Sequence, residues 1–339
     1  MSRKIIDNSV DVKDVGDLVS GSKKVTIDCG VIEMDGLKLN QIMKAAHAAG
    51  LRNFKLINVC GQTLIGTGVQ GPINIEVHGL MGNHAAAFVD RATINSYPTT
   101  FNNGVACPGD AQVAIANTSN PIEFNIGGSV DDLFASYSPS GMFRVAGQGG
   151  NRSGLRAGAG VPTIWREIDF NLYHDMSKKE RVEDMLYKYQ KRRAVLIKKG
   201  WGEFLKDFQV KVENRKPPVI MFGRSVRDYF MEYAQGTIGI VLNIANVDFP
   251  AGYYTCSGMT AGKAYIRGAL ELTHLGERVR FSEIDDSDKT FLAKEIKQFF
   301  DTFNNRLSEQ YQKELDQFIN ELEKDSTRLI SQFKKIIPS

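Results

Sequence analysis

A nine-residue phrase that occurs twice constrains the fold of this chain more than any other feature. Residues Ser129 to Tyr137 and Ser225 to Tyr233 share the pattern Ser-Val-x-Asp-x-Phe-x-x-Tyr. A repeated phrase indicates stacked supersecondary units, because one such unit cannot bury its apolar face alone. Within each phrase we expect the Asp to cap a turn, the Phe to lie in the core and the Tyr to stack.

The spacing of equivalent positions extends the repeat beyond the two phrases. We take Gly128 and Arg224, which directly precede the two phrases, as equivalent positions of the repeat. Steps of nineteen residues, or the ends of strands with alternating apolar residues, give the other equivalent positions: Gly79, Gly109, Gly147, Asn243 and Gly268. Short strands with turn residues at one phase of a period near twenty are typical of a parallel β-helix. The sequence therefore predicts a mainly β protein, a right-handed parallel β-helix of about 19-residue coils. It would carry an N-terminal capping helix, an inserted helical segment and a C-terminal helical region.

One position of the repeat is occupied mostly by small residues. It lies seven residues after each equivalent position, and its occupants are Ala86, Ala116, Ala135, Gly154 and Met231. A small residue suits a sharp turn beneath a closely packed neighbouring coil. Met231 breaks this rule, so we expect it at a distorted or covered coil.

Composition changes divide the chain into five predicted segments. A strand at Lys24 to Asp28 and a helix from about Leu37 to Ala49 form an end cap, because an open terminal coil would expose edge strands. The segments are the cap at 1–57, β-helix parts at 58–160 and 217–284, an insertion at 161–216, and C-terminal helices at 285–339.

The insertion and the C-terminal region each allow two interpretations. The insertion contains fourteen Lys or Arg residues and nine Asp or Glu residues, and its sequence pattern predicts a helix that begins near Lys178. The basic residues of this helix either bind an acidic partner or nucleic acid, or form a face exposed to solvent. A helix is expected from Asp286, followed by an apolar stripe from Tyr311 to Phe333. The stripe folds back on the β-helix or forms a homo-oligomer seam with another chain.

Composition limits the classes of function. The formal net charge of +3 is too small to indicate a basic surface that binds nucleic acid, so we expect no nucleic-acid partner. Four scattered cysteines without a C-x-x-C pair exclude a local iron–sulfur run or four-thiolate zinc site and suggest free thiols in a reducing compartment. No signal-type segment or membrane span is evident, so we expect a cytoplasmic protein without membrane contact.

Motifs that carry chemistry are not found. The sequence has no nucleophile elbow, metalloprotease helix or P-loop, and the glycine-rich run from Gly147 to Gly154 is interpreted as corner glycines rather than a phosphate cradle. His78, His84 and Asp90 are interpreted as ordinary surface residues rather than metal ligands. We therefore predict no catalytic, cofactor-binding or metal-binding residue.

The carboxylates of the repeated phrases allow an acid/base pair as an alternative to a structural role. Asp131, Asp132 and Asp228 share one phase of the repeat. Their shared phase favours turn capping by short carboxylates over paired acid/base work.

Several phrases together resemble the glycine-repeat (GXGXG) domain of the glutamate synthase large subunit, in its archaeal free-standing form. They are Asn58 to Gln62, Val77 to Asn83, Gly109 to Gln112 with Asn117 and Thr118, Gly252 to Tyr254, Gly258 with Met259, and Tyr265 to Gly268. The resemblance implies a non-catalytic scaffold that binds no cofactor. Its partners would be a glutamine amidotransferase and an FMN/iron–sulfur synthase, which together make glutamate from glutamine and 2-oxoglutarate.

Other hypotheses remain beside this one. A similar β-helical scaffold occurs in formylmethanofuran dehydrogenase; the chain could also be an independent hydrolase or lyase, or a self-assembling structural protein. The sequence departs from the GXGXG pattern in its second glycine, which is alanine or Met231 in most units, and in the insertion at 161–216.

Overall fold

The structure, a computed structural model, describes residues 5–31, 33–69, 71–85, 89, 91–101, 106–111, 122–138, 140–158 and 216–339. The chain divides into two units, Met1–Ala159 with Pro217–Ser339, and Gly160–Lys216. The helix predicted from Lys178 lies outside the described residues. No helix in the described part is long and apolar enough to cross a membrane.

Twelve strands of the first unit form one sheet in the described residues, in the order β1-β2-β3-β4-β5-β8-β9-β10-β11-β12-β14-β13. Neighbouring strands are parallel except at β12–β14 and β13–β14. The strands are β1 (Ile5–Ile6), β2 (Val25–Val31), β3 (Asn53–Gln62), β4 (Ile73–Met81), β5 (Ala92–Tyr97), β8 (Glu123–Ile126), β9 (Met142–Val145), β10 (Val219–Phe222), β11 (Gln235–Val241), β12 (Ala261–Arg267), β13 (Val279–Ser282) and β14 (Phe333–Pro338). A second, small sheet pairs β6 (Thr99–Thr100) with β7 (Ala106–Cys107).

The predicted right-handed β-helix is wrong. The strands form a single mixed, mostly parallel sheet with few helices, an α/β-like arrangement, rather than the several long parallel sheets of a coil. The segments between the strands contribute only isolated bridges, such as Met81 with Ala111 and Val226 with Ala251. Left-handed residues recur in these segments and prevent extended strands there.

The nineteen-residue spacing has a structural counterpart in the strand register. Glu123 pairs with Met142 and Val219 with Ile238, each nineteen positions apart. Elsewhere the spacing is wider, as between Val25 and Phe54. A regular 19-residue coil therefore does not extend through the sheet.

The described helices flank the sheet at its first strands and along its later ones. They are η1 (Val12–Asp14), α1 (Val15–Val19), α2 (Gly36–Ala48), η4 (Leu272–His274), α5 (Asp286–Phe303), α6 (Glu309–Lys324) and α7 (Ser326–Ser331). The predicted strand and helix near the N-terminus occur as β2 and α2, and α2 begins at an Asp35 cap that accepts from the amide of Lys38. The helix predicted from Asp286 is α5, which begins with a capping box between Asp285 and Asp288.

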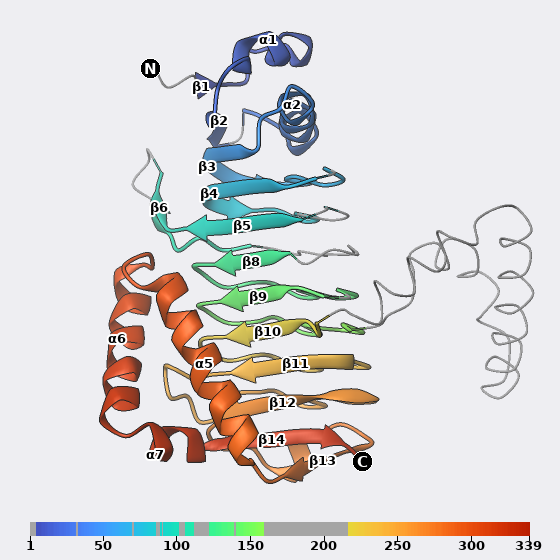
Figure 1. Ribbon diagram of the computed structural model, residues 1–339, viewed down its shortest axis with the longest axis vertical. Helices are drawn as coiled ribbons and strands as arrows, with labels where there is room; N and C mark the ends of the chain where they lie inside the picture. Colours follow the sequence, from blue (N-terminus) through green and yellow to red (C-terminus); the bar gives the residue numbers. More distant parts are fainter. Residues whose placement is uncertain are drawn as a thin grey trace, which may run out of the picture. The chain divides into compact units, whose positions relative to one another are not determined.

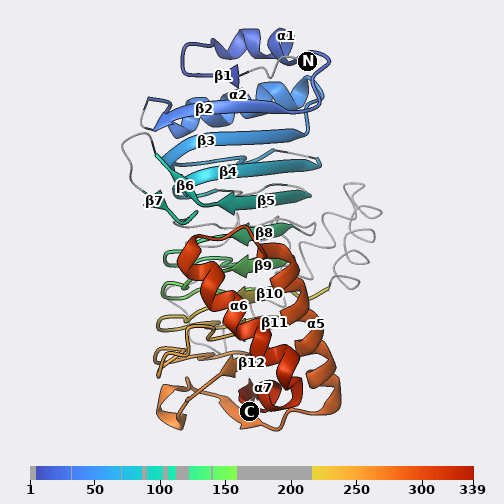
Figure 2. The same ribbon diagram turned by 90° about the vertical axis from the view of Figure 1, so that its left-hand side faces the viewer.

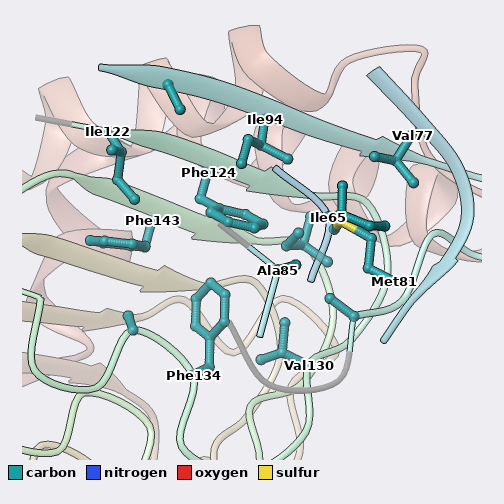
Figure 3. Close-up of a cluster of buried hydrophobic side chains, with 14 of the residues drawn as sticks. Ile65, Val77, Met81, Ala85, Ile94, Ile122, Phe124, Val130, Phe134 and Phe143 are labelled. Carbon is teal, nitrogen blue, oxygen red and sulfur yellow. The ribbon is translucent and has the colours of Figure 1, made fainter. Parts of the chain in front are cut away.

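One face of the sheet packs on the turn segments of the same chain. In Figure 3, Phe124 of β8 and Phe143 of β9 lie beside Phe134 of the first phrase. Their ring centroids are 6.0 and 5.9 Å from that of Phe134, in edge-to-face contacts. Phe230 of the second phrase contacts Phe222 in the same way, at 5.8 Å. The prediction that the phrase Phe lies in the core is confirmed.

The other face changes from polar to apolar along the sheet. One row of paired residues passes from Asn125 and Arg144 to Met221, Ile240 and Tyr265. Helices α5 and α6 run beside the strands that carry the apolar part, as both views show (Figures 1 and 2). Of the two alternatives for the C-terminal stripe, the structure shows the fold-back: its apolar residues pack against the sheet, with Tyr311 and Leu322 partly buried. The prediction of helices over the whole of 285–339 is wrong at its end, because Phe333 lies in strand β14.

Met231 is fully buried, although the repeat favours a small residue at its position. Its φ is 57°, in the left-handed region. A β-carbon on Gly239 would lie 2.1 Å from the Met231 sulfur, so the glycine in β11 leaves the space that the methionine fills. The prediction of a covered position is confirmed.

Candidate interaction surface

The turn segments that follow the strands share an alternating backbone pattern. Three residues in each segment, at every second position, have φ between 50° and 76°. They are Leu133, Ala135 and Tyr137; Arg152, Gly154 and Arg156; Tyr229, Met231 and Tyr233; and Tyr254, Cys256 and Gly258. Successive segments therefore present equivalent residues in three columns.

Backbone hydrogen bonds hold the middle column in register. The amides of Gly154, Met231 and Cys256 donate to carbonyl groups of the preceding segment at 2.7, 2.9 and 2.7 Å. The middle side chains are buried, whereas residues of the outer columns keep exposed surface, with Tyr233 at 47% and Tyr254 at 53%. The side chains of the outer columns therefore face solvent, while backbone hydrogen bonds fix the segments that carry them.

Aromatic and arginine side chains stack along the outer columns. The rings of Tyr229 and Tyr254 are 4.9 Å apart and 12° from parallel, and the guanidinium of Arg152 lies over Tyr229 at 5.2 Å. In the other column, Arg156 lies 5.8 Å from the ring of Tyr233. The stacking role expected for the phrase Tyr is confirmed for Tyr233. A β-carbon on Gly258 would lie 2.5 Å from that ring, so glycine permits its position.

A second aromatic group adjoins these columns. The imidazole of His274 stacks with the rings of both Tyr253 and Phe249, at centroid distances of 5.0 and 5.6 Å. Phe249 is 64% exposed, and Leu272, in the same 3-10 helix as His274, is 72% exposed. We call the combined group the aromatic surface; it comprises Arg152, Arg156, Tyr229, Tyr233, Phe249, Tyr253, Tyr254, Leu272 and His274.

The energy of this arrangement does not favour large side chains at the outer positions. A non-glycine residue in the left-handed region costs roughly 1–2 kcal/mol. An aromatic pair returns about 0.5–1.5 kcal/mol and an exposed cation–π contact about 0.5–1 kcal/mol. The two effects nearly cancel, so the stacked tyrosines add little to folding, yet Tyr233 and Tyr254 remain about half exposed on the same surface as Phe249 and Leu272. Such patches mark contact sites.

The phrase carboxylates have the structural role predicted for them. Asp132 accepts from the amide of Asn151 at 2.6 Å, and Asp228 accepts from the amide of Tyr253 at 2.8 Å. The structural role is confirmed, but not as turn capping: each carboxylate accepts from an amide of the following turn segment, 19 and 25 residues further along the chain. Asp131 links to the preceding segment through its own amide, which donates to the carbonyl of Ala111. The carboxylate bonds join neighbouring turn segments and so position the aromatic surface.

The glycine run and the histidines also lie where packing explains them. A β-carbon on Gly149 would lie 2.5 Å from the ring of Phe222, so close packing on that ring accounts for this glycine. His78 lies in β4 with its ring nitrogen 2.8 Å from Glu76, and His84 follows β4 in a turn. Asp90 lies outside the described residues.

Glu76 is the centre of a charged cluster on the polar sheet face. Its carboxylate contacts Lys24 at 2.6 Å, Lys55 at 3.3 Å and His78. Burial opposes the charge, but the hydrogen bonds from Lys24, His78 and Lys55 lower the pKa of Glu76 to about 2. All its partners come from neighbouring strands or their ends, so the cluster ties the sheet together.

A second charged cluster joins α5 to the sheet. The fully buried carboxylate of Asp288 accepts from Lys335, Tyr265 and Lys263. Burial opposes its charge, yet these hydrogen bonds hold the pKa of Asp288 below its usual range. Because the three donors lie on β12 and β14, this network fixes the first turn of α5.

Metal binding and similarity to known proteins give no further assignment. In the part of the chain that the structure describes, no three His, Cys, Asp or Glu side chains are grouped to hold a metal ion. The chain matches no known family model and no curated protein. The sequence revealed the phrase tyrosines, but Phe249, Tyr253 and Leu272 fall outside the phrases, and only folding brings them to the same surface.

Proposed function

We propose that this chain is a non-catalytic scaffold subunit of a glutamate synthase-type complex and that the aromatic surface is where a partner subunit docks. The proposal also places the chain in the cytoplasm. The observation that carries the docking role is the exposed group of stacked tyrosines and arginines. Tyr and Arg are enriched among the residues that dominate protein–protein binding energies.

The physical form of the surface suits protein recognition. Tyr229 and Tyr254 are held by stacking, and Arg152 is held both over Tyr229 and in an ion pair with Glu232 at 3.2 Å. Side chains that are already ordered lose little conformational entropy when a partner binds. Such a surface gives more affinity per contact than a mobile one.

The resemblance to the GXGXG pattern supports the identity of the complex. Ala135 and Met231 occupy the phase of the second repeat glycine, and both have left-handed φ, 53° and 57°. Glycine is the residue that adopts this conformation without cost. A left-handed backbone at these two positions is the conformation that a glycine pattern would suit, and this agreement supports the proposed resemblance.

In this proposal the chemistry belongs to the partners. A glutamine amidotransferase would release ammonia, and an FMN/iron–sulfur synthase would use it to aminate 2-oxoglutarate. The present chain would bind no cofactor and would hold these proteins in a fixed arrangement. A scaffold like that of formylmethanofuran dehydrogenase is the alternative, with the same surface and different partners.

Co-purification tests the proposal. The tagged full-length chain would be isolated from its native cells, and we expect an amidotransferase and an FMN/iron–sulfur synthase to elute with it. A Tyr233→Gly/Tyr254→Gly variant should lose these partners, because glycine suits both left-handed positions while removing the rings. Leu37→Ser is the matched control, since Leu37 is 59% exposed on α2 and outside the aromatic surface.

The outcomes separate the hypotheses. Elution of the wild-type chain alone, or with unrelated proteins, would overturn the proposed complex. Components of formylmethanofuran dehydrogenase in the eluate would favour the alternative scaffold. Turnover of a substrate by the isolated chain would favour an independent enzyme.

A further inference from the structure

Strand β13 forms an edge of the twelve-stranded sheet and pairs on one side only, with β14. The antiparallel register places Val279 opposite Pro338, Arg280 opposite Ile337, and Ser282 opposite Lys335. Figure 1 shows β13 at the end of the stack of strands, beside the C-terminus. An edge strand presents backbone groups that another strand can bind.

The direction of these backbone groups follows from one hydrogen bond. The amide of Ser339 donates to the carbonyl of Arg278 at 2.9 Å, so residue 278 belongs to a hydrogen-bonded pair. Hydrogen-bonded and non-hydrogen-bonded pairs alternate in an antiparallel ladder, so Arg280 also faces β14. Val279 and Phe281 therefore direct their N–H and C=O groups away from β14. Pro338 agrees with this, because it lacks an N–H and lies opposite Val279.

These outward groups are available for a further strand. Among the described residues, none forms a backbone hydrogen bond with the outward groups of Val279 or Phe281. The side chains of both residues pack partly against the core, which fixes the strand in place. Arg280 is exposed on the other face. The edge is thus ordered before any partner arrives.

We infer that β13 is the interface strand of a homodimer, in which two copies of this chain pair β13 antiparallel about a two-fold axis at Phe281. This register places Phe281 opposite Phe281 of the partner subunit and Val279 opposite Glu283 of the partner subunit. All outward backbone groups from residue 279 to residue 283 then meet a partner. Arg280 lies opposite Ser282 of the partner subunit.

Charge and hydrogen bonding select this register over its neighbours. A shift of two residues in one direction places Arg280 opposite Arg280 of the partner subunit, and like charges directly opposite are destabilising. The opposite shift requires the amide of Asp285, which already donates to the Asp288 carboxylate at 3.2 Å. Only the register centred on Phe281 avoids both costs.

The structure favours a second copy as the occupant. A two-fold interface pairs the same edge on both subunits and closes, so no free edge remains at this end of either sheet. The inference does not depend on the proposed function, since the edge and the aromatic surface can be altered separately.

Sedimentation of the full-length chain tests the inference. We expect a dimer for the wild type and for Val279→Ala, and a monomer for Val279→Pro. Proline removes the outward N–H without removing a bond to β14, and edge positions tolerate it. Thermal denaturation of the two variants checks that each remains folded.

A charge pair at Ser282 tests the register even if the proline variant fails to fold. Ser282→Glu should tighten the dimer because it meets Arg280 of the partner subunit, and Ser282→Arg should weaken it at least about fivefold. Because Ser282 also lies opposite Lys335 of β14, thermal denaturation of both variants checks that each remains folded. A wild type that is monomeric up to about 100 µM would overturn the inference. So would dimers that respond to neither the proline nor the charge variants, because their interface would lie elsewhere.

Discussion

The guanidinium of Arg267 lies over the ring of Phe318, 5.1 Å from its centroid, and joins the sheet to helix α6. The same group donates to Gln332 at 2.7 Å and to the carbonyl of Asn243 at 3.0 Å. It also contacts Glu321 at 3.2 Å. Because this arginine is almost fully buried, its partners must be present for its charge to be tolerated.

We expect Arg267→Met to destabilise the protein by roughly 2–4 kcal/mol, because the substitution leaves the groups around Asn243 and Gln332 without their donor. Urea denaturation monitored by circular dichroism measures the change. Lys297→Met is the control, since Lys297 is exposed and pairs with Asp301 of the same helix. Equal stability of the two variants would contradict the role assigned to Arg267.

Acid should weaken the attachment of α5 through Asp288. Its folded-state pKa is lowered, so the carboxylate contributes stability that is present above its unfolded value and is lost as pH falls through the folded value. The free-energy difference between wild type and Asp288→Asn should therefore be largest near neutral pH and shrink below about pH 4. Unfolding free energies measured at several pH values test this, and a difference that grows in acid would refute it.

The stability contributed by the Glu76 cluster should also fall in acid, over a defined range of pH. The pKa of Glu76 is about 2 in the folded protein. Its contribution should be complete above an unfolded value of about 4.3 and should be lost as pH falls toward 2. Glu76→Gln should thus reduce stability at pH 7 and flatten the acid limb of the stability profile. An unchanged profile would show that Lys24 and Lys55 do not stabilise this carboxylate.

Met231 and Gly239 should behave as a coupled pair. Gly239→Ala places a β-carbon where the Met231 sulfur lies, so we expect a loss of about 1–3 kcal/mol from overpacking. Combining it with Met231→Ala should recover part of that loss, because the smaller side chain frees the space. A double-mutant cycle measures the coupling, and strictly additive effects would contradict the contact.

Sequence reasoning predicted the local features of this protein better than its sheet architecture. The buried Phe of the phrases, the helix α2 and the start of α5 follow from the sequence, because helix caps and apolar periodicity are local signals. The phrase carboxylates were predicted to cap their own turns, but they bond to the next turn segment instead. The β-helix prediction failed because it assumed regular coils that supply strands to several sheets, whereas the segments between the strands contribute only isolated bridges. Bulky residues such as Tyr229 and Tyr254 gave no signal that their backbone is left-handed.

The aromatic surface could be predicted only in part for a related reason. Tyr233 belongs to a repeated phrase, and its stacking follows from that phrase. Phe249 and Tyr253 lie in a loop and stack with His274 of a 3-10 helix, and no periodic pattern in the sequence predicts this contact. Long-range contacts of this kind depend on the register of the whole sheet.

The affinity of the chain for the proteins that co-purify with it is the most direct test of its proposed role as a docking scaffold. We expect the Tyr233→Gly/Tyr254→Gly variant to keep wild-type stability within about 1 kcal/mol, since lost stacking and relieved backbone strain offset each other. Its dissociation constant for the partner should rise at least about tenfold, whereas Leu37→Ser should bind as the wild type does. Unchanged affinity in the folded double variant would contradict the account.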